Sequence, residues 1–405
     1  MPLKECCFRP EYGYTASASE RPIGPKFLRI TDIQNGGVDW EKVPYVATPD
    51  QEARDYFLEA GDILIARIGA TTGKAYLIQE CPEAVFASYL IRVRTKPGLL
   101  PEFLNYCLQT FEYWQHIDSQ KGGRLKGGVN IPILENLEIP FPSPIEQRAI
   151  VQVLDAARNG GETRQRELAL ERERMTFLMD YLFTHGTRGE PTKQTEIGEI
   201  PNSWKVVSLR DVARITSGGT PDRTRPEYWN GGIPWAKTGE VRYNTIHETD
   251  ETISRAGLEN SAAKIIPAGT LLMAMYGQGI TRGKVAILGI DAALNQACAA
   301  ILLSGGVVPS FIFFYLQFAY DQIRTLGHGA NQKNLNAQLV GSIQIPLPPL
   351  EEQEQICDPL LAIDTKLTAI ERERALLDEL FKTLLAELMT GRLSEIPLIE
   401  EHQPQ

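Results

Sequence analysis

Ile139-Pro140-Phe141-Pro142, followed by Glu146-Gln147, decides the fold, because this stretch returns as Ile345-Pro346-Leu347-Pro348 followed by Glu352-Gln353. Further matches recur in chain order at separations of 200 to 210 residues: Gly61-Asp62-Ile63-Leu64 with Gly269-Thr270-Leu271-Leu272, Gly73-Lys74 with Gly283-Lys284, and Glu171-Arg172-Glu173-Arg174 with Glu371-Arg372-Glu373-Arg374. One short match arises by chance, but several at nearly one separation indicate an internal repeat. The chain is therefore expected to hold the same unit twice.

The first part of each copy has the pattern of a compact α+β domain. Strands are expected over residues 61–69 and 75–79, and again over 269–276 and 284–288. Helical spacing follows over 101–117 and over 309–326. Pro, Gly, Asn and Asp separate these runs at short intervals, as they do in turns.

A long helix follows each α+β part. In the second copy, apolar residues recur at alternating gaps of three and four and predict a coiled-coil seam: Ile356, Leu360, Ile363, Leu367, Ile370, Leu377, Phe381, Leu384 and Leu388. Arg374 interrupts this seam. Pro359 either kinks the helix or marks a fresh start, and Gly391 is expected to end it. In the first copy the pattern is less regular: Gly160-Gly161 interrupts it, and the matching places are assigned to Leu170, Arg174, Phe177 and Tyr181.

The resulting organisation has six segments: an α+β domain over 1–143, a long helix over 144–187, a linker over 188–200, a second α+β domain over 201–347, a second long helix over 348–395 and a tail over 396–405. The two helices could simply belong to one domain core. Their equivalent places in a duplicated chain favour another arrangement, in which they pair antiparallel about a pseudo-twofold axis. The helices would then hold the two α+β domains apart.

Composition narrows the classes of protein that fit. The 405 residues carry a net charge of -10, but residues 201–345 hold 13 basic against 10 acidic residues, whereas residues 346–405 hold 5 against 13. A local basic surface is therefore compatible with the overall charge. The six cysteines and five histidines show no metal-binding or disulfide spacing, so no metal site is expected. No apolar run is long enough to span a bilayer and no signal peptide is evident, which predicts a cytoplasmic protein without a membrane partner.

Several phrases carry a family resemblance. Ile200-Pro201-Asn202-Ser203-Trp204, Thr216-Ser217-Gly218-Gly219-Thr220-Pro221 and Ile233-Pro234-Trp235 look like the opening of a recognition domain, and Leu182-Phe183-Thr184-His185-Gly186 and Leu388-Met389-Thr390-Gly391-Arg392-Leu393 look like helix endings. Together with the repeat, they resemble the specificity (S) subunits of Type I restriction-modification systems, the HsdS family. The resemblance covers nearly the whole chain. One departure is that the first domain lacks a counterpart to residues 200–209, so the resemblance does not define the boundary of this domain near residues 1–14. The pseudo-symmetry of the family suggests that the C-terminal end of the chain completes the cyclic arrangement there.

The resemblance implies two tandem α+β target recognition domains separated by two long antiparallel coiled-coil helices. Each domain would read one half of a split, asymmetric site in double-stranded DNA. The helices would set the spacing and bind two modification (methyltransferase) subunits, and restriction (motor-nuclease) subunits would join them. S-adenosylmethionine, ATP and Mg are expected on those partners, with no cofactor and no catalysis on this chain. A helix of about 40 residues is roughly 60 Å long, which corresponds to about 17 base pairs at 3.4 Å each.

Two pairs of loops at equivalent places supply the candidate DNA contacts. The turns 69–74 and 279–284 share the pattern G-x-x-x-G-K and offer Thr71, Thr72, Lys74, Thr281, Arg282 and Lys284. A nucleotide-binding P-loop needs another residue between the glycines and a Ser or Thr after the lysine, so nucleotide binding is not expected. The loops 120–126 and 327–334 offer Lys121, Arg124, Lys126, Asn331, Gln332, Lys333 and Asn334. Arg67, Arg223, Arg225, Lys237, Tyr276 and Gln278 are weaker candidates.

Each candidate has a plainer explanation. A hairpin with a solvated lysine, or a polar loop without a ligand, would leave the same residues in the same places. Arg bonds guanine and Asn or Gln bonds adenine through paired donors and acceptors, so the different side chains in the two copies favour different half-sites. Trp229 and Trp235 are expected to pack in a core or turn and not to stack on bases.

Two other kinds of function are alternatives, and the first is that the chain is itself an enzyme, either a methyltransferase or a nuclease. An adenine methyltransferase would need an Asn/Asp-Pro-Pro-aromatic motif, and Pro348-Pro349-Leu350 is not one. A nuclease would need an Asp/Glu-x-Lys motif in a concave site, whereas Asp364-Thr365-Lys366 falls within the predicted seam helix. The second alternative is a stand-alone bipartite DNA-binding regulator without methyltransferase partners, which co-purification would distinguish from a specificity subunit.

Overall fold

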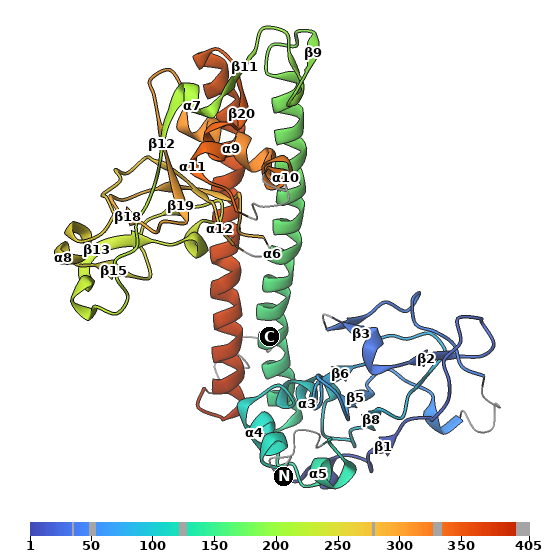
Figure 1. Ribbon diagram of the computed structural model, residues 1–405. Helices are drawn as coiled ribbons and strands as arrows, with labels where there is room; N and C mark the ends of the chain where they lie inside the picture. The colour runs from blue at the N-terminus through green and yellow to red at the C-terminus, as the bar shows by residue number, and fades with distance from the viewer. Residues whose placement is uncertain (35, 48–53, 121–127, 278–279, 327–333, 394–405) are drawn as a thin grey trace, which may run out of the picture. The chain divides into compact units, whose positions relative to one another are not determined.

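The computed structural model describes residues 1–405 apart from 35, 48–53, 121–127, 278–279, 327–333 and 394–405 (Figure 1). The chain divides into two compact units. The first comprises Met1–Gln165 and Arg372–Gln405, and the second comprises Arg166–Glu371. Two long helices, α6 (Pro144–His185) and α12 (Leu350–Met389), each contribute one half to each unit. Among the described helices, none combines the length and the apolar character that crossing a membrane requires.

A four-stranded antiparallel sheet lies at the centre of the first unit, with strand order β1-β8-β5-β6. Its elements are α1 (Leu3–Cys6), β1 (Glu11–Tyr12), β2 (Lys26–Leu28), η1 (Ile30–Asp32), β3 (Ile33–Gln34), β4 (Gly37–Val38), η2 (Arg54–Tyr56), β5 (Ile63–Ala66), β6 (Ala75–Leu77), β7 (Ala84–Phe86), β8 (Leu90–Val93), α3 (Pro101–Cys107), α4 (Phe111–Gln120) and α5 (Ile131–Glu135). Ile63 and Ile65 of β5 pack in one core with α3, α4 and the halves of the long helices, and Leu64 packs in another with β2 and β7. Because both faces of β5 are covered, the strand is apolar at every position.

The second unit repeats this sheet with one more strand, in the order β12-β19-β16-β17-β14. Its elements are β9 (Thr192–Thr195), β10 (Gly198–Pro201), β11 (Lys205–Ser208), α7 (Leu209–Val212), β12 (Ala213–Ser217), η3 (Pro226–Tyr228), β13 (Trp229–Ala236), η4 (Thr238–Glu240), β14 (Thr245–Ile246), β15 (Thr252–Ile253), α8 (Arg255–Glu259), β16 (Leu271–Ala274), β17 (Val285–Leu288), β18 (Ala293–Leu294), β19 (Cys298–Leu303), α9 (Pro309–Phe318), α10 (Tyr320–Thr325), α11 (Ala337–Gly341) and β20 (Gln344–Leu347). Ile63 lies opposite Val93 in the first sheet, and Leu271 lies opposite Ile301 in the second. Both partners are shifted by 208 residues, so the predicted repeat is confirmed at the level of strand register.

The glutamine of each repeated Glu-Gln pair is buried, and its side-chain amide makes three hydrogen bonds at equivalent places in the two units. Gln147 is fully buried; its Oε1 accepts the backbone N–H of Leu100 at 2.8 Å, and its Nε2 donates to the carbonyls of Gly98 and Pro142, each at 2.9 Å. Gln353 is 1 % exposed and binds Val308, Gly306 and Pro348 in the same way. Each glutamine thereby fixes the start of a helix, α3 or α9, against the start of a long helix.

The halves of α6 and α12 pack side by side within each unit (Figure 1). In the first unit the Arg164 guanidinium lies 2.9 Å from Glu373, and the guanidinium of Arg158 lies 5.2 Å from the ring centroid of Phe381. In the second unit Lys366 binds Glu171 at 2.7 Å. In the first unit the residue numbers on one helix rise as those on the other fall, so the pairing there is antiparallel, as predicted. All nine predicted seam residues of α12 are buried or half-buried.

The predicted seam of the first copy is wrong. Leu170 is 65 % exposed, Phe177 72 % and Tyr181 49 %, and Arg174 is exposed as well. The inward positions of α6 are instead the following, at alternating gaps of three and four: Leu154, Ala157, Gly161, Arg164, Leu168, Glu171, Met175, Leu178 and Leu182. A glycine, an arginine and a glutamate occupy this seam. The apolar residues alone therefore do not identify the inward face of α6 from the sequence.

Three further expectations about the helices and the linker are corrected or resolved. α6 runs without a break through Gly160-Gly161, where an added Cβ at Gly160 would lie 3.5 Å from the methyl groups of Leu377. α12 continues through Pro359, so there is no fresh start, and Gly391, with φ +68°, follows its end as predicted. The expected linker over 188–200 contains a hairpin, in which β9 pairs with β10. The strands of this hairpin are mostly polar and show no alternation of apolar and polar residues, so the sequence did not predict them.

Candidate nucleic-acid interface

The described parts of the two G-x-x-x-G-K segments share the same closing hydrogen bond, each between two antiparallel strands. In the first unit the N–H of Gly73 donates to the carbonyl of Ala66 at 2.8 Å; in the second, Gly283 donates to Ala274 at 2.8 Å. Gly73 and Gly283 have φ of +91° and +90°, a conformation that glycine adopts without strain. The turn is therefore a hairpin connection, as the sequence predicted.

The second pair of loops ends beside the exit from the same strand in each unit. The N–H of Val129 donates to the carbonyl of Arg67 at 2.9 Å, and the N–H of Leu335 donates to the carbonyl of Met275 at 3.0 Å. Each hydrogen bond ties the residues that follow a predicted loop to the strand that precedes the hairpin turn. Seven candidates fall outside the described residues: Lys121, Arg124, Lys126, Gln278, Asn331, Gln332 and Lys333. Asn334 is described and exposed.

The candidates of the first hairpin are exposed or half-buried. Lys74 is exposed, Thr71 is half-buried, and the Thr72 hydroxyl donates to the carbonyl of Gly69 at 2.6 Å, which closes the turn. Arg67 is half-buried, with Cζ 4.6 Å from the centroid of the Tyr12 ring.

The candidates of the second hairpin are less accessible. Arg282 is only 8 % exposed and donates to the carbonyl of Arg324 at 2.8 Å, so its side chain braces the turn against α10. Thr281 and Lys284 are half-buried, and the Lys284 ammonium lies 5.5 Å from the Tyr243 ring centroid. Tyr276 is 41 % exposed.

Arg223 and Lys237 share one carboxylate. Both cations form ion pairs with Glu251, and the Lys237 ammonium lies 2.9 Å from it. The hydrogen bond from Arg223, followed by that from Lys237, lowers the pKa of Glu251. The Arg223 guanidinium also lies 3.8 Å from the ring centroid of Trp229. Asp250 also lies 3.4 Å from the Lys237 ammonium, so both cations have carboxylate partners within the chain. Arg225, the remaining weak candidate, is exposed and pairs with Glu227.

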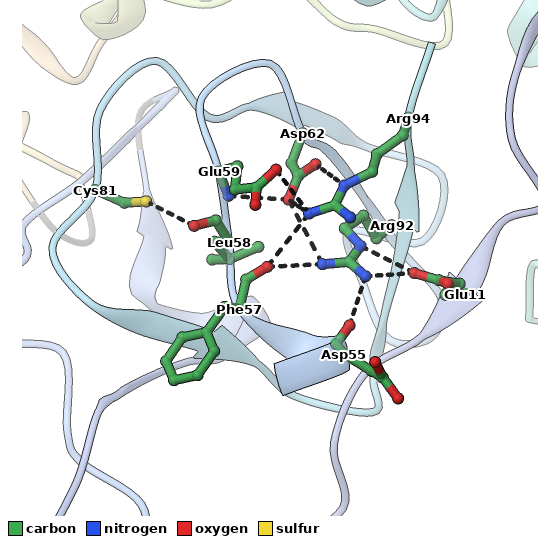
Figure 2. A network of polar contacts seen from close by, with 9 residues as sticks. All are labelled: Glu11, Asp55, Phe57, Leu58, Glu59, Asp62, Cys81, Arg92 and Arg94. Carbon is green, nitrogen blue, oxygen red and sulfur yellow. Dashed lines mark hydrogen bonds and ion pairs between the residues drawn. The ribbon is translucent and has the colours of Figure 1, made fainter. Parts of the chain in front are cut away.

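The first unit contains an ionic network around the buried Arg92 and Asp62, at positions where the second unit has uncharged residues (Figure 2). Arg92 is 2 % exposed; it forms an ion pair with Glu11 and donates to the carbonyls of Phe57 and Asp55. Arg94 binds the buried carboxylate of Asp62, with its Nε 2.6 Å from Oδ1. Figure 2 shows how these side chains converge on the segment that leads into β5. At the equivalent positions the second unit has Thr270, Ala300 and Leu302, so the two α+β domains share a sheet but differ in the packing on one of its faces.

Several exposed residues near the first hairpin were missed in the sequence. Tyr12 is 37 % exposed, Ile68 41 % and Tyr89 53 %. They occur singly, outside the repeated motifs, so no sequence pattern marks them. Trp235, by contrast, is fully buried and its indole N–H donates to the carbonyl of Gly219, as expected of a packing residue. No cluster of three or more potential metal ligands occurs in the described ranges.

Comparison with known proteins agrees with the repeat. The family model for the Type I restriction modification DNA specificity domain matches residues 5–172 and again residues 201–379. The chain belongs to this family. Each matched range contains the shared sheet with its hairpin turn.

Relatives extend the similarity over most of the chain. The Type I restriction enzyme MjaVIII specificity subunit of Methanocaldococcus jannaschii is 25 % identical over 351 residues, which cover 84 % of this chain and 81 % of that protein. The Type I restriction enzyme EcoR124I/EcoR124II specificity subunit of Escherichia coli is 22 % identical over 244 residues, 58 % of this chain and 57 % of that one. The crystal structure of the Type I restriction-modification system S subunit from M. genitalium shares the fold, with a TM-score of 0.64 at 16 % identity over 96 % of this chain and 95 % of the other.

Proposed function

We propose that this specificity-domain protein reads a bipartite, asymmetric site in double-stranded DNA, with each α+β domain contacting one half. One observation carries the proposal. The hydrogen bond that closes each hairpin turn and the one that follows each predicted loop occupy the same place in both units, while the sequences of these turns and loops differ. Glycine-rich turns let a backbone approach DNA closely, and polar side chains on such loops reach phosphates or base edges. A duplicated scaffold with diverged loops suits two different half-sites.

The paired helices are proposed to fix the distance between the half-sites. Each is at least 40 residues long, which corresponds to roughly 60 Å or about 17 base pairs. Support comes from the pairing within each unit, where ion pairs and a continuous seam hold the helices in register. Helices joined by packing along their whole length bend less than a single helix.

The same helices are proposed to bind two modification subunits. The outward row of Leu170, Phe177 and Tyr181 is apolar and exposed on the α6 half of the second unit. On the α12 half of the first unit Leu376 is 58 % exposed and Leu380 47 %. Exposed apolar rows of this kind mark protein-binding surfaces. Leu170 and Leu376 are 206 residues apart, the separation of the two buried glutamines, so these two leucines occupy equivalent places in the repeat.

Beside the first of these rows, a groove of 730 Å³ separates α6 from α9 and α10. Its lining includes Phe177, Phe318, Tyr243, Asp180 and Asp321. Aromatic side chains flanked by carboxylates favour an apolar segment with basic residues. Restriction subunits would join through the modification subunits, and S-adenosylmethionine, ATP and Mg would be bound by those partners. This chain would then supply recognition and no catalytic group.

A stand-alone DNA-binding regulator is the second candidate. It requires the same half-site contacts but no partner on the helices. The exposed Phe177 row favours the specificity subunit, because a protein that acts alone gains nothing from such a surface and risks aggregation.

The decisive experiment expresses the chain with its modification subunits and maps N6-methyladenine across the DNA of the host. We expect one bipartite motif with a fixed gap of unspecified bases, and two modification subunits per chain in the purified complex. Replacing residues 201–345 with those of a relative should change one half-site only. A motif without a gap, or a change in both halves, would refute the proposal; a chain that binds DNA but purifies without a partner would favour the regulator.

A further inference from the structure

The first unit has a cluster of two exposed tyrosines and a half-buried arginine beside its hairpin turn. Tyr12 ends β1, Arg67 follows β5 and Tyr89 precedes β8. The Arg67 guanidinium carbon lies 4.6 Å from the centroid of the Tyr12 ring, and the backbone N–H of Arg67 donates to the carbonyl of Tyr89 at 2.9 Å. Tyr12 is 37 % exposed and Tyr89 53 %. The cluster is thus assembled from three segments and presented to solvent.

Arg67 lies over an aromatic ring, as Arg92 and Arg223 do, but it differs from these two arginines in its charge balance. Arg92 is paired with Glu11, and Arg223, which also lies over an aromatic ring, is paired with Glu251. Arg67 has no carboxylate partner among the residues that the structure describes. A ring under the face of a guanidinium leaves the N–H groups at its edge open to an external acceptor.

The fold itself does not require this cluster. In the second unit the hydrogen bond from Met275 to Ala297 replaces that from Arg67 to Tyr89. Ser217 stands opposite Ala299, as Tyr12 stands opposite Ile91. Serine, methionine and alanine therefore occupy the places of Tyr12, Arg67 and Tyr89. Residues needed to form the shared sheet would recur in both units, so the cluster belongs to what distinguishes one recognition domain from the other.

We propose that Arg67, held against Tyr12, reads a guanine in the half-site of the first unit, with Tyr89 contacting the adjacent nucleotide. This inference rests on the proposed function. An arginine that donates two N–H groups to O6 and N7 of guanine makes the commonest specific contact in the major groove. The Tyr12 ring restricts the motion of the side chain before DNA arrives, so less conformational entropy is lost on binding. Exposed tyrosine and arginine side chains are also the types that dominate binding energy in interfaces.

The test uses the whole complex with its modification subunits and a set of duplexes in which each base pair of the first half-site is replaced in turn. Arg67→Lys keeps the charge and removes the fork of donors. We expect about a ten- to a hundredfold weaker binding of the cognate duplex, little further loss when the contacted G·C pair is replaced, and an unchanged second half-site. Tyr12→Leu should weaken discrimination at the same base pair, and Tyr12→Phe should restore it because the ring is kept.

Arg255→Lys is the matched control. Arg255 is an exposed arginine of the second unit, and its side chain is 87 % exposed and paired with Glu259; this variant should bind every duplex as the parent does. Thermal unfolding and co-purification establish that each variant is folded and assembled. If Arg67→Lys leaves discrimination at every base pair unchanged, and Arg67→Ala weakens all duplexes equally and lowers the salt dependence, Arg67 contacts phosphate and the inference is wrong. If the parent complex itself has no bipartite motif, the proposed function fails first, and this outcome is distinguishable because it precedes any substitution.

Discussion

Removing the amide of Gln147 should destabilise the first unit by an amount that follows from its three hydrogen bonds. Gln147→Ala leaves the N–H of Leu100 and the carbonyls of Gly98 and Pro142 without their partner. A typical hydrogen bond contributes about 1 kcal/mol net, and an unpaired buried group costs about 1–3 kcal/mol. Water can reach part of the space that the side chain leaves, so we expect a loss of about 3–5 kcal/mol in the free energy of unfolding of this unit.

Amide hydrogen exchange measures this loss locally. The N–H of Leu100 and those of the first turn of α3 should exchange about a hundredfold faster or more, because each 1.4 kcal/mol changes an equilibrium constant tenfold. The amide of Val308, which Gln353 holds in the second unit, should keep its protection. Gln353→Ala should give the reverse pattern with a somewhat smaller loss, since its bond to the Gly306 carbonyl is 3.5 Å long.

Two controls make the prediction specific. Gln79→Ala removes an exposed glutamine from the same unit and should change stability by less than about 0.5 kcal/mol. Gln147→Glu retains an acceptor for Leu100 but places a carboxylate oxygen against two carbonyls, so it should be at least as harmful as the alanine variant. A loss below about 1 kcal/mol for Gln147→Ala, or equal effects in both units, would refute the reasoning that these amides hold each domain to its own helix.

Four other predictions concern the helices. Gly160→Ala should stabilise the first unit by about 0.5–1 kcal/mol in chemical unfolding because alanine favours helix, whereas Gly160→Leu should destabilise it by about 1–3 kcal/mol because it overpacks against Leu377. Phe177→Asp should leave unfolding within about 0.5 kcal/mol of the parent but abolish co-purification of one modification subunit; unchanged stoichiometry would argue against the proposed surface. Burial, and then the nearby charge of Glu371, raise the pKa of Asp364, so the folded state binds its proton more tightly and loses stability as pH rises from the unfolded pKa through the folded pKa. Asp364→Asn should therefore stabilise the second unit at neutral pH and have little effect in acid, as unfolding at several pH values would reveal. Inserting one heptad into each long helix should lengthen the gap of the methylated motif by about three base pairs, since seven residues add roughly 10.5 Å, and should leave both half-sites intact.

The sequence was sufficient wherever a local pattern determines the structure. The repeat, the glycine turns and the seam of α12 could be predicted, because turn chemistry and helical periodicity act over a few residues. The recurrence of Glu-Gln was visible too, although the reason for it, a buried amide, was not.

Contacts between distant segments were decided only by the tertiary structure. The seam of α6 includes Gly161, Arg164 and Glu171, and these face inward because the partner helix offers Asp378, Glu373 and Lys366. Likewise, nothing in the neighbouring sequence indicates that Arg282 is buried while Arg67 has no carboxylate partner in the part of the chain that the structure describes. Burial and charge pairing depend on which residues come together in three dimensions, and a pattern along one chain does not contain that information.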